Sequence, residues 1–113
     1  MALTITHVKS GMTGNAYEHV VDLSAASYTA AGEALTGSNL ASLLPRLGPV
    51  SASGATVSPL IQFFTSERNL AGLTCVLDRA AGKILFVTAT TDGTGGSNYG
   101  PVRCRVRYGM TGD

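Results

Sequence analysis

The feature that most constrains the fold is a strict alternation in the segment PVRCRVRY, residues 101–108. Successive side chains of a β-strand point to opposite faces of a sheet. A strand here therefore buries one face and lines the other with guanidinium groups. The apolar positions are Val102, Cys104, Val106 and Tyr108, and the basic ones are Arg103, Arg105 and Arg107. The pattern predicts a β protein whose sheet meets another surface, and it does not suggest an active site.

Further strands are expected where the chain alternates, or where apolar runs lie between turn residues. They cover residues 3–8, 17–23, 56–65, 73–77 and 83–90. Gly11 and Gly14 mark a turn after the first strand, and Pro59 indicates an edge or a bulge in the third. The segment DRAAG at 78–82 has the length and chemistry of a hairpin connection, with Gly82 at a positive φ.

One short helix is expected at residues 39–44, where Ser38 offers an N-cap and Pro45 ends the helix. The run SASGAT at 51–56 predicts a loop, and DGTGGSNYG at 92–100 predicts a flexible one. The fold class is therefore all-β. We expect a small antiparallel β-sandwich, jelly-roll-like, with one short helix, in a single domain over residues 1–113.

The chain is poor in charge. Charged residues make up 13% of it, about half the usual fraction, and apolar residues make up 44%. So low a fraction of charged residues favours a surface that is covered by sister copies or by a larger assembly. The net charge of +1 argues against nucleic acid as a partner. We expect no signal peptide and no membrane span, because the apolar runs are only a few residues long.

No group of residues predicts catalysis, a cofactor or a metal ion. His7 and His19 lie within alternating segments, where a histidine is more often packed or solvated than catalytic. They would bind a metal only if their strands pair in register, and no cysteine or acidic cluster supports that. The glycine-rich segment 92–100 has the spacing of a phosphate-binding loop, but Pro101 and Val102 stand where Lys and Ser or Thr are needed. The sequence therefore predicts a protein that is not an enzyme.

The two cysteines, Cys75 and Cys104, lack the paired spacing of a zinc site. Both fall on expected strands among apolar residues, so buried free thiols are the favoured state. A disulfide requires that the two strands be neighbours.

The arginines at 103, 105 and 107 have two interpretations. In the first, they are the solvated face of an edge strand, where like charges discourage pairing with another sheet. In the second, they form a docking face whose planar groups make bidentate bonds to carboxylates of a partner subunit. Tyr99, in the preceding loop, would then be an aromatic anchor for the same partner. The loop itself is either a hairpin connection or a partner contact.

Two motifs carry a resemblance. The first is YTAAGEAL at 28–35, followed by a leucine-rich turn at 40–44, and the second is the hairpin CVLDRAAGKIL at 75–85. Over residues 17–90 the chain resembles small virion proteins of tailed bacteriophages, whereas the loop at 91–100 and the arginine segment lie outside the resemblance. It implies a capsid cement or decoration protein that is made in the bacterial cytoplasm and bound outside the shell. The implied partners are the major capsid protein and sister copies in a homotrimer.

Two alternatives stay open. One is a tail, connector or fibre-base component of the virion, which would form rings or hexamers. The other is a host-surface or sugar-binding β module, which the lack of Trp and the presence of only four Tyr make less favourable.

The first motif also has a direct physical interpretation as a structural motif of Tyr28, Gly32, Glu33 and Leu35. Gly32 permits a backbone turn that other residues avoid. Glu33 is expected to accept backbone N–H bonds as a structural carboxylate. Leu35 and the leucines at 40, 43 and 44 are expected to plug one end of the sandwich.

Overall fold

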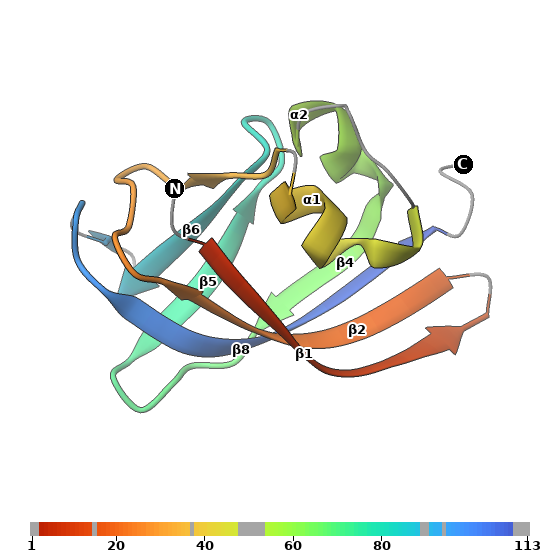
Figure 1. Ribbon diagram of the computed structural model, residues 1–113, viewed down its shortest axis with the longest axis horizontal. Helices are drawn as coiled ribbons and strands as arrows, with labels where there is room; N and C mark the ends of the chain where they lie inside the picture. Colours follow the sequence, from red (N-terminus) through yellow and green to blue (C-terminus); the bar gives the residue numbers. More distant parts are fainter. Residues whose placement is uncertain are drawn as a thin grey trace.

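The protein, as a computed structural model, is described at residues 3–14, 16–36, 38–47, 54–88, 91–93 and 95–109. Two antiparallel sheets form it (Figure 1). The first has the order β1 (Leu3–Thr13), β2 (Ala16–Ala25), β8 (Tyr99–Gly109) and β4 (Ile61–Ser66). The second has the order β3 (Glu33–Ala34), β6 (Lys83–Thr88) and β5 (Leu73–Asp78), and β7 (Thr91–Asp92) also pairs with β6. The prediction of a small all-β sandwich is confirmed.

Short helical segments lie at one end of the sandwich (Figure 1). They are α1 (Ser38–Leu43), the 3-10 turn η1 (Pro45–Leu47), α2 (Gly54–Val57) and the 3-10 turn η2 (Ser58–Leu60). The predicted helix at 39–44 corresponds to α1. The expectation of a single helix was wrong, because part of the predicted loop at 51–56 forms α2. The rest of that loop, at 51–53, lies outside the described residues.

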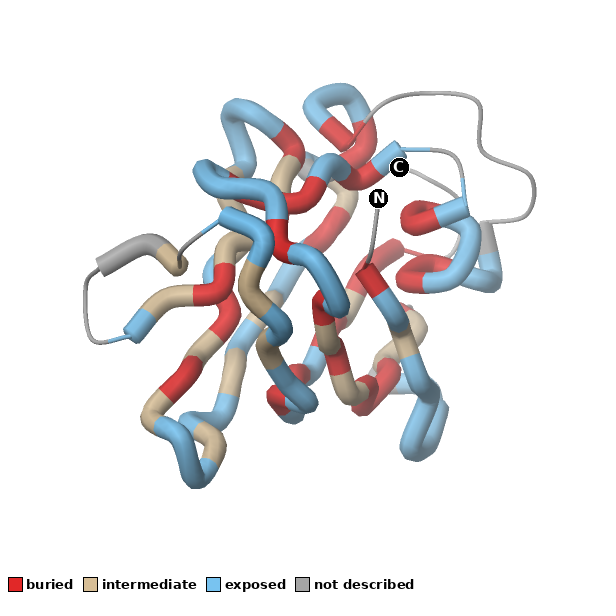
Figure 2. Tube along the Cα trace, turned by 60° about the vertical axis from the view of Figure 1, so that its left-hand side comes forward, coloured by how far each residue is buried: buried red, intermediate tan, exposed pale blue. Residues whose placement is uncertain are grey.

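The core lies between the sheets and beneath the helices. Buried and exposed residues alternate along the middle of β8, from Val102 to Val106, whereas β2 has only buried and half-buried residues; Figure 2 shows the buried residues along the whole trace. Leu35, Leu40, Leu43 and Leu44 have no exposed surface. The predicted leucine plug is therefore present, and it closes the core at the end where α1 lies.

Two predicted boundaries needed correction. β1 does not turn at Gly11 but continues to Thr13, because its backbone stays paired with β2 past a bulge between His7 and Lys9. The strand expected at 56–65 begins only at Ile61, since Pro59 lies in the 3-10 turn before it and has no N–H to give to a ladder. Beyond Thr88, positions 89 and 90 lie outside the described residues.

The segment 92–100 was predicted as a loop but is partly paired. Its ends belong to β7 and β8, and backbone hydrogen bonds connect Tyr28 with Ser97 and with Gly96. Gly93 donates its N–H to the carbonyl of Phe86. These bonds hold the described part of the segment against the core.

The predicted hairpin at 78–82 is confirmed. Asp78 pairs with Lys83, and Gly82 closes the turn by donating its N–H to Asp78 at 2.8 Å. Gly82 has a φ of +65°, and a Cβ there would lie 2.1 Å from the amide nitrogen of Ala55 in α2. The position therefore requires glycine for its backbone conformation and for the close approach of α2.

Candidate functional site

The three predicted arginines lie along the outer face of β8. This strand is not an edge, because β2 pairs with one side of it and β4 with the other. The interpretation of the arginines as a guard on an exposed edge was therefore wrong. We call this surface the arginine face: Arg103, Arg105 and Arg107 with their neighbours Glu18, Asp22 and Phe63.

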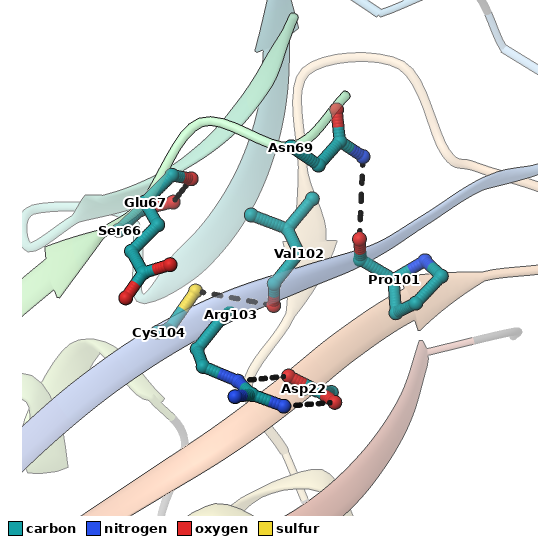
Figure 3. Close-up of polar contacts among 8 residues, drawn as sticks. All are labelled: Asp22, Ser66, Glu67, Asn69, Pro101, Val102, Arg103 and Cys104. Carbon is teal, nitrogen blue, oxygen red and sulfur yellow. Dashed lines mark hydrogen bonds and ion pairs between the residues drawn. The ribbon is translucent and has the colours of Figure 1, made fainter. Parts of the chain in front are cut away.

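Arg103 is bound to a carboxylate of its own chain. The register of β2 and β8 places Asp22 directly opposite Arg103. The guanidinium donates from Nε to Oδ1 at 3.0 Å and from Nη2 to Oδ2 at 3.2 Å (Figure 3). These bonds and the charge of Asp22 raise the pKa of Arg103. The bidentate geometry expected for a partner is thus already satisfied within the sheet.

Arg107 is held in the same manner but more loosely. Its guanidinium lies 3.6 Å from Glu18, which faces it from β2. On the β4 side, its carbon Cζ lies 5.1 Å from the centre of the Phe63 ring. The Nε atom of Arg107 is buried and has no hydrogen-bond partner among the described residues.

Arg105 differs from both neighbours. It is exposed, and the residues opposite it are Val20 on β2 and Thr65 on β4, neither of which carries a charge. Within the described part of the chain, its guanidinium makes no ion pair. A cavity of about 100 Å³ lies beside it, lined also by Glu67 and Arg103. Of the three arginines, Arg105 is therefore the one whose donors remain available to a partner.

A preorganised loop adjoins this face between β4 and β5. The Asn69 carboxamide oxygen accepts the N–H groups of Ala71 and Leu73, both at 2.9 Å. Its Nδ2 donates to the carbonyl of Pro101 on β8 at 3.2 Å (Figure 3). The loop carries Leu70, which is fully exposed, beside a cavity of about 300 Å³ that reaches Arg103.

Sequence reasoning did not single out Leu70. The available signal was the segment ERNLAG between two strands, where an asparagine can organise a turn by bonding the backbone beyond it.

Tyr99 was predicted as an aromatic anchor for a partner. It is half-buried, and its ring centre lies 5.6 Å from that of Tyr28 and 6.3 Å from that of Phe86. The ring therefore belongs to the aromatic part of the core. This placement does not favour the role of an exposed anchor.

The motif at 28–35 builds a turn against β6. The Tyr28 hydroxyl accepts the N–H of Phe86 at 3.2 Å, and Glu33 accepts the N–H of Thr29 at 2.7 Å. Glu33 is buried, so the structural carboxylate expected there is present. Gly32 has a φ of +121°, and a Cβ there would lie 2.9 Å from that of Lys83. Leu35 continues the turn into the core.

The two histidines lie together under α1. Their rings are nearly perpendicular, with centres 5.2 Å apart. His7 donates from Nε2 to the carbonyl of Ser42 at 2.7 Å. His19 is buried and bonds on both sides, through Nδ1 to the Ser10 hydroxyl and through Nε2 to the Tyr108 hydroxyl, each at 2.7 Å. No group of three metal-ligating side chains occurs among the described residues.

Cys75 and Cys104 are buried free thiols, as expected. Their strands, β5 and β8, belong to different sheets, yet the thiols meet across the core. A hydrogen bond with the Cys104 thiol, together with burial, raises the pKa of Cys75. Ser66, on β4, links β5 and β8 at this point. Its hydroxyl accepts the N–H of Cys75 at 2.9 Å, and its backbone pairs with Cys104.

No helix in the described ranges combines the length and the apolar character needed to cross a membrane. We compared the chain with protein-family models, with curated proteins and with solved structures, and none of them matches. The resemblance to phage virion proteins therefore stays a prediction from the two sequence motifs, and the structure shows the fold alone, a small antiparallel β-sandwich.

Proposed function

We propose that the chain is a non-enzymatic structural protein of a bacteriophage virion. Its role would be that of a capsid cement or decoration protein, which binds the outer surface of the shell as a homotrimer. The partners are the major capsid protein and two sister copies. The observation that carries this proposal is the composition of the arginine face.

That face combines the features of a protein interface core. Arginine and aromatic residues are enriched in such cores, and a charge buried there without a partner is costly. Two of its arginines are matched by Asp22 and Glu18, and Phe63 is 37% exposed. Arg103 and Arg107 therefore keep their carboxylate partners when a partner covers the face, so neither is left as an unpaired buried charge. Arg105 remains to bind a carboxylate of the capsid subunit.

The mechanism is bridging. Each copy makes modest contacts with sister copies and with neighbouring capsid subunits, and the symmetry of the shell repeats them. Several weak contacts that are linked give a much higher overall affinity than any one of them alone. A shell held in this way resists the pressure of packaged DNA without a single tight site. The motif at 28–35 and the hairpin at 75–85 support the same assignment through their resemblance to virion proteins.

The test is attachment to undecorated, expanded shells of the phage that encodes the chain. We expect the triple variant with Arg103, Arg105 and Arg107 replaced by Ser to stay folded but to occupy fewer sites on the shells. Arg105→Ser alone should account for most of this loss, whereas Lys83→Ser, which removes a cation from β6 in the second sheet, is the control. Unchanged occupancy of the triple variant would reject the proposal.

Light scattering tests the second part of the proposal. A trimer is expected for the purified chain, alone or on the shell. Rings or hexamers would instead indicate a tail or connector component, and a monomer that ignores shells would reject both.

A further inference from the structure

A second site lies on the other face of the first sheet, at the end covered by η1. It is a cavity of about 270 Å³ lined by Ser10, Gly11, Met12, Tyr17, His19 and Arg46. This volume is just below the usual range for small-molecule pockets, so a ligand of a few heavy atoms would fit. None of these residues is acidic, and the site shares no residue with the arginine face.

The hydrogen bonds at His19 define what the cavity offers to a ligand. The buried Tyr108 hydroxyl accepts the backbone N–H of Arg46 at 3.1 Å, so it satisfies its own proton by donating to Nε2 of His19. Neutral His19 then carries its proton on Nδ1 and donates it to the Ser10 oxygen. The Ser10 hydroxyl proton is left to point elsewhere, and Ser10 is exposed at the cavity.

This direction of donation separates the site from a catalytic triad. A serine nucleophile must give its proton to the histidine, whereas Ser10 receives a hydrogen bond from it. With the His19 proton on Nδ1, the Ser10 hydroxyl is free to donate toward the cavity.

The surroundings of the cavity are electropositive. Burial lowers the pKa of His19, and its electrostatic interactions with His7 and Arg46 lower it further. The Arg46 guanidinium lies 5.7 Å from the centre of the Tyr17 ring. Met12, more than half exposed, adds an apolar surface beside that ring. The cavity thus combines one cation, one hydroxyl donor and an apolar wall.

We propose that this cavity binds the carboxylate group of a small organic acid, with Arg46 and Ser10 as the donors. The planar guanidinium matches a carboxylate in geometry, and its single charge matches the charge of one carboxylate better than that of a phosphate dianion. The apolar part of the acid lies against Met12 and Tyr17. This inference is independent of the proposed virion role.

Benzoate is the probe. The ¹⁵N-labelled protein is titrated with sodium benzoate, and sodium chloride keeps the ionic strength constant. Saturable shifts are expected for the amide signals of residues 10–12 and 17 and for the His19 imidazole. Arg46→Gln should raise the dissociation constant about tenfold or more, because a hydrogen bond to a charged group is lost. Arg68→Gln removes an exposed arginine elsewhere and should leave the constant unchanged.

Each other outcome overturns the proposal. The absence of saturable shifts would show that the cavity does not bind benzoate. An equal rise of the dissociation constant in both arginine variants would show that binding is only a general attraction between charges. Tighter binding of inorganic phosphate than of benzoate would contradict the assignment to carboxylates. The long-range ¹H–¹⁵N spectrum of His19 reports its tautomer, and a proton on Nε2 would contradict the proposed direction of donation.

Discussion

The two faces of the β2–β8 pair use polar residues in opposite ways. The outer face carries the charged pairs of Arg103 with Asp22 and of Arg107 with Glu18, all in contact with water. The inner face carries a neutral chain of hydrogen bonds from Tyr108 to His19. Exposed ion pairs contribute little to stability, because water and salt screen them. Buried hydrogen bonds between neutral groups contribute more to stability, because no water takes the place of a lost partner. The face with more charge is thus expected to be the less important one for folding.

The largest expected effect is that of Tyr108→Phe. It leaves the N–H of Arg46 and Nε2 of His19 without a partner inside the protein. We expect the free energy of unfolding in urea to fall by about 2 kcal/mol or more. Tyr17→Phe is the control, since Tyr17 is only half-buried and its substitution should change the free energy of unfolding by about 0.5 kcal/mol or less. Equal losses of unfolding free energy for the two variants would contradict the importance of the buried hydrogen bonds from Tyr108 to His19.

The next effect depends on pH. The pKa of His19 is lowered in the folded protein, so the unfolded chain binds the proton more readily. The stability that neutral His19 contributes is complete above about pH 6.5, the usual value, and decreases as the pH falls below it toward the lowered value. Urea unfolding at a series of pH values should show this decrease. His19→Gln should flatten the curve in this range, and an unchanged slope would mean that another group causes it.

The smallest effect is expected on the outer face. Arg103→Gln removes the ion pair with Asp22, but the partly exposed Asp22 carboxylate regains water. The change in unfolding free energy should be several-fold smaller than that of Tyr108→Phe, and added salt should reduce it further. A loss of unfolding free energy as large as that of Tyr108→Phe would show that the two faces are equally important for stability.

The sequence predicted the strands whose periodicity is local. β2, β8 and the hairpin of β5 and β6 could be located from alternation and turn residues alone. The helix α2 could not, because it packs against the distant Gly82, and β4 begins later than expected because Pro59 lies in the 3-10 turn before it. Secondary-structure propensity is a weak guide where tertiary contacts determine the local structure.

The candidate site was predicted only in part. Alternation alone placed three arginines on one face, but their partners depend on which strand lies beside β8. Asp22 and Glu18 are four residues apart, as are Arg103 and Arg107, and this matched spacing fits an antiparallel pairing. The chain of bonds through His19 joins residues 9 and 89 positions apart, so no local pattern could reveal it.

The loop that carries Leu70 also has a practical use. Asn69 fixes the backbone there, and the side chain at position 70 projects fully into solvent. The two natural thiols are buried. A Leu70→Cys variant would therefore provide one accessible thiol in a defined position, suited to attaching a fluorophore or a displayed cargo.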